Sequence, residues 1–164
     1  MLKDKLAAGF AISQFAMEAD LKGVGHEESL KQPSPGGNCL NWLAGHILIA
    51  RGLILTQLGE KPFLDEAETK PYGRGSPPLK PGGPCVALDR ILEGIQKTGE
   101  VLSGKLESLE DSALEAPLDP AAFSLPVEIP TLGALLTVLL WHEGYHTGQL
   151  AVGLRLIGRE IGFK

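Results

Sequence analysis

Three of the four histidines in the sequence lie in apolar segments, at a spacing typical of metal ligands. His142 and His146 are four residues apart, so on a helix both imidazoles project from one face. His46 lies far upstream, in a second apolar segment. Because unpaired imidazoles are costly to bury, we expect the three to share one metal ion rather than to be separate core histidines bonded to carbonyls or carboxylates. Three protein ligands leave coordination positions open, as in catalytic metal sites.

Two other classes of metalloprotein share parts of this pattern. The string from His142 to His146 matches the H-E-x-x-H motif of zinc peptidases, but the residues after it do not supply the third ligand of those enzymes. Glu143 and His146 form the Glu-x-x-His element of di-iron proteins, but residues 39–58 contain no acidic residue for the rest of such a site. Glu143 is therefore a candidate general base or a support for the metal site, with an exposed or interhelical carboxylate as the alternative.

The surrounding residues carry expectations of their own. Gln149 would orient a ligand or bond across helices, and Trp42 would belong to the core or to a pocket wall. We interpret Cys39 as a small buried hydrophobic residue. Arg51 would bind an anionic substrate group or, as the favoured interpretation, lie at the surface with its alkyl chain packed on apolar neighbours. The fourth histidine, His26, lies in a polar stretch and is expected in a loop.

Apolar residues that recur at helical spacing predict four helices, over residues 3–21, 38–58, 86–109 and 131–157. Asn38 is the predicted N-cap of the second helix, and Gly59 and Gly158 mark the ends of the second and fourth. No stretch of the sequence alternates apolar and polar residues over enough positions for a convincing strand. The sequence therefore predicts an all-α fold, a four-helix bundle that forms a single domain over residues 1–164.

The connection between the second and third helices, residues 59–85, is rich in proline and glycine. It is long enough to return along a helix of about 30 Å. The second and third helices would then run parallel, which predicts an up-down-down-up order with one long loop.

Composition excludes several classes of function. The chain has 164 residues, 43% of them hydrophobic, and a net charge of −5. An acidic protein lacks the surplus of lysine and arginine that nucleic acids and anionic membranes attract, so neither partner is expected. Two cysteines do not make a disulfide framework. The first residues lack the apolar stretch of a signal peptide, and His46 and Arg51 interrupt the longest apolar run. We therefore expect a cytoplasmic protein.

Two motifs, one in each histidine-containing helix, resemble those of the DinB-like superfamily (DinB/YfiT-like proteins). They consist of Asn38, Trp42 and His46, followed by His142, His146, Gly148 and Gln149. The resemblance implies an up-down-down-up bundle that holds one divalent ion, commonly zinc or nickel, with His46, His142 and His146 as the ligands. It also implies a homodimer. Related branches of the superfamily are metal-dependent enzymes that transfer low-molecular-weight thiols such as bacillithiol, mycothiol or glutathione.

A three-histidine ion with open positions acidifies a bound water or thiol and polarises a substrate. The functional hypothesis is therefore a metal-dependent enzyme of the thiol S-transferase or hydrolase kind, acting on a small-molecule substrate, in which Glu143 is the candidate catalytic residue. The alternative is a non-catalytic protein that holds a metal ion as a stress-response or binding module. A site closed by a fourth protein ligand would favour that alternative.

Overall fold

The computed structural model describes residues 1–33, 37–118 and 128–163. Its long elements are four α-helices, α1 (Leu2–Leu21), α3 (Leu40–Gln57), α5 (Leu88–Ser108) and α6 (Leu132–Leu156). Shorter elements are α2 (His26–Ser29), α4 (Glu66–Thr69) and the 3₁₀ turns η1 (Lys70–Tyr72) and η2 (Asp111–Glu115). In these described ranges there is no strand, only an isolated bridge between Pro117 and Thr131. The prediction of an all-α protein is confirmed.

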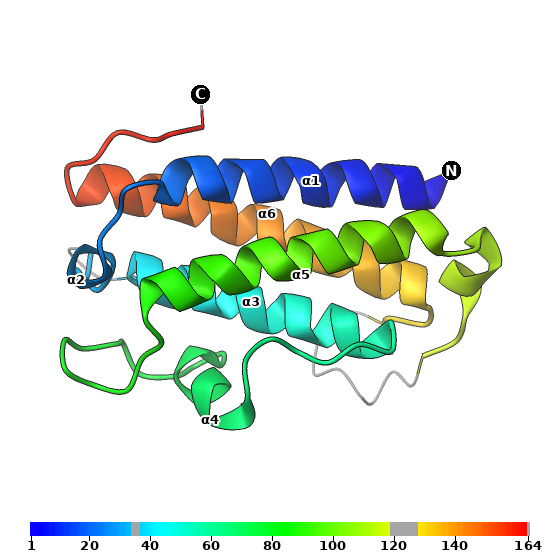
Figure 1. Ribbon diagram of the computed structural model, residues 1–164, viewed down its shortest axis with the longest axis horizontal. Coiled ribbons are helices and arrows are strands. Elements are labelled where there is room, and N and C mark those ends of the chain that lie inside the picture. The colour runs from blue at the N-terminus through cyan, green and yellow to red at the C-terminus, as the bar shows by residue number, and fades with distance from the viewer. Residues whose placement is uncertain (34–36, 119–127, 164) are drawn as a thin grey trace.

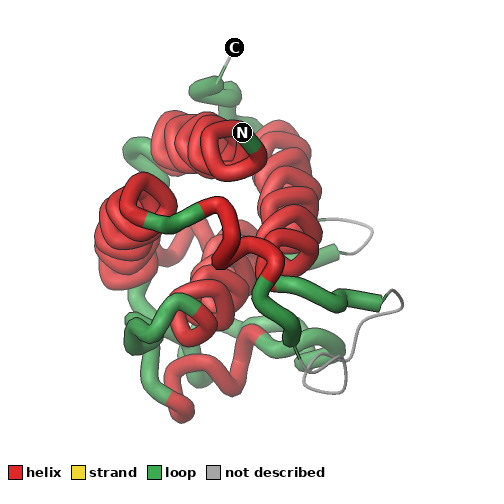
Figure 2. Tube along the Cα trace, turned by 90° about the vertical axis from the view of Figure 1, so that its right-hand side faces the viewer, coloured by secondary structure: helices red, strands yellow, loops and turns green. Residues whose placement is uncertain are grey.

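The four long helices lie side by side. Helix α1 packs on α5 and α6, and α3 packs on the same two helices, so each long helix has two neighbours (Figures 1 and 2). In Figure 1, α3 and α5 begin at the left end of the molecule, whereas α1 and α6 begin at the right end. The chain therefore places α3 antiparallel to α6, and the segment between α3 and α5 returns along the side of the molecule.

The helix ends follow local sequence signals, with one exception. Gly59 and Gly158 have φ angles of +79° and +84° and lie just beyond α3 and α6, where a left-handed residue ends a helix. Thr131 caps α6, because its side chain accepts a hydrogen bond from the Ala134 N–H. The predicted cap at Asn38 was wrong. The N-cap of α3 is Cys39, without a side-chain hydrogen bond, so the helix begins after the residue whose side chain suits a cap best.

The segment between α3 and α5 is more ordered than the predicted loop, because it carries α4 and η1. Tyr72 anchors it: the side chain is fully buried, its hydroxyl donates to Asn41 Oδ1 at 2.9 Å and accepts from the Val86 N–H at 2.7 Å. Burial raises the pKa of Tyr72 to about 12, so the hydroxyl remains a donor at neutral pH. Gly45 permits this contact, because a Cβ at that position would overlap the Tyr72 ring.

The apolar core consists of two clusters separated along the helix axes. The first surrounds the N-terminal half of α3, and the second surrounds its C-terminal end. Each cluster takes residues from all four long helices. Between the clusters lies a layer of buried polar side chains, to which every long helix contributes: Ser13, Arg51, Thr98, Glu143 and Thr147.

Helix α3 is buried on most of its circumference, because it lies inside the molecule between α5, α6 and the η1 segment. Residues 40–45 are all buried, which covers every side of the helix over that stretch. Among the described residues, none of the helices combines the length and the uninterrupted apolarity needed to cross a membrane.

Candidate metal centre

The three predicted ligands meet at the interface of α3 and α6. Helix α3 supplies His46, and α6 supplies His142 and His146 from adjacent turns. One candidate ligand nitrogen from each residue lies within 4.8 Å of the other two. The Nε2 atoms of His46 and His142 are 3.1 Å apart, close to the spacing of about 3.3 Å that two nitrogen ligands take on one tetrahedral ion.

Hydrogen bonds on the far side of two rings define which nitrogen is available. His46 donates from Nδ1 to the backbone carbonyl of Tyr72 at 2.7 Å, and His146 donates from Nδ1 to Gln149 Oε1 at 2.7 Å. Because a carbonyl oxygen only accepts, both rings carry their proton on Nδ1 when neutral. Both Nε2 atoms therefore carry a lone pair, as they do in metal-binding histidines whose other nitrogen binds a backbone or side-chain oxygen. The lone pair of His46 lies within hydrogen-bond distance of His142 Nε2.

The third ring, His142, lacks such a partner. Its Nδ1 atom is buried and has no hydrogen bond within the part of the chain that the structure describes. Its Nε2 atom faces His46 Nε2 instead, so one nitrogen of each of the three neutral imidazoles converges on the other two. A divalent ion would satisfy the converging lone pairs, and imidazole ligands suit zinc and nickel as well as copper and iron. The residues present therefore fit the ion that the sequence predicts.

Burial also keeps the three rings neutral. It lowers the pKa of His46, His142 and His146, mainly because desolvation disfavours the imidazolium form. The effect is largest for His142, whose pKa falls to about 4 as the neighbouring histidines add their charge. Metal binding requires the neutral imidazole, so all three predicted ligands are in the form that binds a metal at pH 7.

Aromatic rings form the walls around the histidines. The indole of Trp42 stacks on His46, with ring centroids 4.6 Å apart and planes 14° apart, and its N–H donates to Ser76 Oγ at 2.8 Å. Trp42 is thus both a core residue and a wall of the site, as predicted. Tyr145 presents its ring to the edge of His146 at a centroid distance of 5.0 Å. Cys39 is buried, as expected for a small hydrophobic residue.

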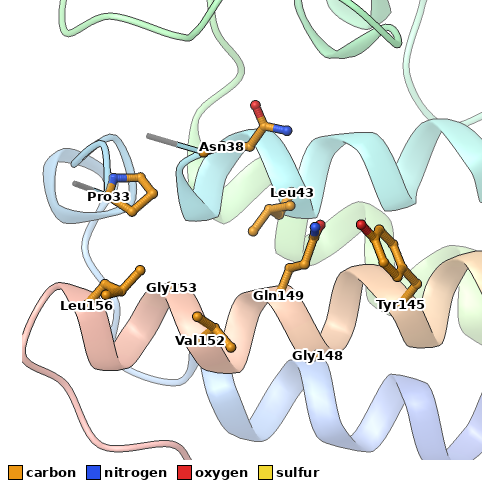
Figure 3. A pocket seen from close by; sticks show the side chains of 10 residues that line it. Pro33, Asn38, Leu43, Tyr145, Gly148, Gln149, Val152, Gly153 and Leu156 are labelled. Atoms are coloured by element: carbon orange, nitrogen blue, oxygen red, sulfur yellow. The ribbon is translucent and has the colours of Figure 1, made fainter. Parts of the chain in front are cut away.

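A hollow of about 360 Å³ lies between the C-terminal half of α6 and the residues at the start of α3 (Figure 3). Gln149 and Tyr145 extend from α6 toward α3 (Figure 3), and Gln149 accepts the hydrogen bond from His146 Nδ1. None of the described residues that line the hollow is charged. They are Pro33, Gly37, Asn38, Leu43, Tyr145, Gly148, Gln149, Val152, Gly153 and Leu156. Gln149 therefore touches both the hollow and a candidate ligand.

Glu143 does not join the group formed by His46, His142 and His146. Its carboxylate accepts two hydrogen bonds from Arg51, from Nη2 at 2.7 Å and from Nε at 2.8 Å, and both side chains are buried. The favoured interpretation of Arg51 as a surface residue was wrong: it is 1% exposed, because a carboxylate distant in the sequence neutralises its charge. The catalytic role of Glu143 stays a prediction.

His26 and Tyr72 are further departures from the sequence interpretation. His26 begins the short helix α2 instead of lying in a loop, and its Nδ1 accepts the Leu88 N–H at the start of α5. Its Nε2 lies 3.9 Å from Cys85 Sγ. Tyr72 supports His46 through a backbone carbonyl, which no residue type reveals. The prolines and glycines around it gave no signal of its position.

An all-helical protein in which two helices bring three neutral imidazoles together is a candidate mononuclear metalloprotein. The sequence model of the DinB superfamily matches residues 14–150. The chain belongs to the DinB superfamily, and the predicted resemblance is confirmed. No curated protein matches the sequence.

Proposed function

We propose that the protein binds one divalent ion, zinc or nickel, through His46, His142 and His146, and uses it as an enzyme of the thiol S-transferase or hydrolase kind on a small molecule. The observation that carries the proposal is the convergence of the three rings, with Nδ1 of His46 and His146 already engaged. We also propose that the four long helices form the up-down-down-up bundle that the family resemblance implies.

The chain's own residues contribute binding and orientation. When bound, the ion supplies a Lewis acid that lowers the pKa of a thiol or water. The Tyr72 carbonyl and the Gln149 amide keep the ligand rings in one tautomer, and Trp42 shields one face of His46 from water. The uncharged hollow beside Gln149 would receive the body of the thiol or of its acceptor. In S-transfer the thiol loses its proton, sulfur bonds to an electrophilic carbon, and the leaving group departs with the bonding electrons.

The number of ligands favours an enzyme over a non-catalytic metal-holding module. Among the described residues, the histidine group has three members and no cysteine, aspartate or glutamate as a fourth. Three protein ligands leave room for a substrate or water on the ion.

Metal content tests the site itself. We expect about one zinc or nickel ion per chain in the purified protein, measured by mass spectrometry, and its loss in His46→Ala, His142→Ala and His146→Ala. His26→Ala is the matched control, because His26 is also partly buried and bonded but lies beside Cys85, outside the group. Equal metal content in all five proteins would refute the site.

Cobalt substitution tests the chemistry. We expect bacillithiol, mycothiol or glutathione to change the visible spectrum of the cobalt-loaded protein, because a thiolate that joins the ion changes its ligand field. A spectrum that none of the three thiols changes would remove the S-transferase function. Hydrolysis of a panel of small esters and amides, abolished by His142→Ala, would then identify the hydrolase, and its absence would leave the non-catalytic module.

A further inference from the structure

We propose that Arg51 and Glu143 are positioning residues, whose ion pair fixes the axial register of α3 against α6 and so holds His46 opposite His142 and His146. This inference rests on the proposed metal site, because it concerns how that site is assembled. It also gives Glu143 a role other than that of a general base.

The pair is saturated and inaccessible. Both oxygens of Glu143 accept from Arg51, and the two side chains are 2% and 1% exposed. The remaining guanidinium nitrogen donates to the Ile95 carbonyl at 2.7 Å and to Gln14 Oε1. A carboxylate held in this way is occupied by Arg51 and closed off from solvent, whereas a bidentate pair between two helices has a single favourable geometry.

The pair lies in the buried polar layer between the two apolar clusters. Thr147, one turn from Glu143, donates to the Glu143 carbonyl at 2.8 Å and lies 3.3 Å from Ser13 Oγ. Apolar clusters lie on both sides of this layer. A buried polar group that has its partners at only one register is the best-attested device for specifying how helices align.

Register matters at this interface because the candidate ligands come from both helices. Helix α3 presents apolar side chains on most sides, so most of them would still meet apolar neighbours after a slip by one helical turn, about 5.4 Å, although Leu40 would leave its place against Gly153. The same slip would separate Arg51 from Glu143 and move His46 out of reach of the α6 rings. His142 precedes Glu143 directly, and His46 is about 7.5 Å along α3 from Arg51. The ion pair and the three histidines therefore depend on the same axial alignment of α3 and α6.

Replacement of the whole pair separates register from stability. In Arg51→Met/Glu143→Leu no lone charge remains buried, and we expect a folded helical protein that is more stable than either single variant. Its affinity for cobalt should nevertheless fall by about tenfold or more, as when the support of a metal ligand is lost. Thr98→Val and Leu102→Ala are the controls, because they alter the buried layer and the core from α5 and leave every side chain of α3 and α6 as it is.

A distance measurement gives a readout that does not depend on metal. Nitroxide labels at Leu53→Cys on α3 and Arg155→Cys on α6 occupy exposed positions, in a chain that also carries Cys39→Ser and Cys85→Ser. An excess of unlabelled protein restricts the measurement to distances within one chain. Pulsed electron resonance should give one narrow distance with the native pair. In Arg51→Met/Glu143→Leu the distance distribution should broaden or gain a second population displaced by about one turn, roughly 5 Å.

The outcomes distinguish the two proposals. An equally narrow, unshifted distance together with wild-type cobalt affinity in the paired variant overturns the register role. A wild-type protein that binds no metal overturns the proposed function, while the distance distributions still test the register. If the paired variant does not fold, Glu143→Gln replaces it, since it keeps the side-chain shape but offers Arg51 only one acceptor oxygen. An unchanged distance distribution and cobalt affinity in that variant would overturn the register role as well.

Discussion

His46 and His146 each use one ring nitrogen for a hydrogen bond that belongs to the fold, and the other nitrogen remains for a ligand. The two acceptors differ in kind. The Tyr72 carbonyl is a backbone atom, which a substitution does not delete, whereas the Gln149 amide is a side chain that a single substitution removes. Gln149 is therefore the residue through which the support of the site can be tested directly.

Gln149→Leu should weaken metal binding by about 10- to 100-fold, because His146 loses the acceptor that holds its tautomer and ring orientation. Gln149→Glu should bind at least as tightly as the wild type, because a carboxylate is a stronger acceptor. Competition with a coloured chelator measures both affinities. Gln96→Leu, an exposed position on α5, is the control. Unchanged affinity in Gln149→Leu would show that the amide does not support the site.

The metal-free protein should lose stability as the pH falls from about 6.5 toward 4. Burial lowers the pKa of His142 to about 4 in the folded state, whereas an unfolded histidine titrates near 6.5. In this window the unfolded chain binds more protons, so protonation favours unfolding. Melting temperatures in the presence of a chelator at pH 7.5, 6.0 and 5.0 measure the effect. His142→Asn should flatten the profile, and an equal slope in both proteins would contradict this origin.

The three histidines that converge could be predicted from the sequence, but the groups that support them could not. A spacing of four residues on a helix is a local property, and it placed His142 and His146 on one face. The partner of Arg51 lies on another helix, so its burial depends on a pairing that no local pattern contains. The carbonyl that binds His46 belongs to residue 72, and every residue type has a carbonyl.

Helix boundaries were predictable where glycine and apolar spacing determine them, as at the ends of α3 and α6. The short elements α4 and η1 were not, because Tyr72 orders that segment through contacts with Asn41 on α3 and with the Val86 backbone. A proline-rich connection predicts a loop by composition. The close approach of its one buried tyrosine to Gly45 is a tertiary contact.

Substitution by alanine should have opposite effects at Gly45, which the Tyr72 ring covers, and at Gly104, which has open space beside it. Gly45→Ala should destabilise the protein by about 1–3 kcal/mol, because the new methyl group overlaps the Tyr72 ring and overpacks the site. Gly104→Ala, within α5 and with no atom near the new methyl, should stabilise it by about 0.5–1 kcal/mol through helix propensity. Urea unfolding measures both. A stabilising Gly45→Ala would mean that the Tyr72 segment does not pack on α3 in solution.

The outer surfaces of the long helices differ in charge. On α5 the exposed side chains include Asp89, Arg90, Glu93 and Lys97. Between residues 141 and 152 the exposed side chains of α6 are uncharged, and Trp141, at 67% exposure, stacks on Tyr145. A contact of this surface with its own copy brings no charge into the interface, which suits the symmetric, self-complementary interfaces of homodimers.

We therefore expect a homodimer in solution, formed through the outer surface of α6. Light scattering after size-exclusion chromatography should give twice the chain mass for the wild type and the monomer mass for Trp141→Glu, because a carboxylate in an apolar interface has no partner. Val101→Glu on α5, also exposed, should remain dimeric. A wild-type monomer at high concentration would exclude this interface, and a monomeric Val101→Glu would place it elsewhere.

The buried polar layer divides the apolar core without dividing the chain. The cluster on each side of the layer is assembled from portions of α1, α3, α5 and α6, so neither cluster can form from a contiguous piece of sequence. Removal of any one long helix would open both clusters at once. Neither half of the core can therefore fold without the other, and unfolding should be a single cooperative transition in which both are lost together.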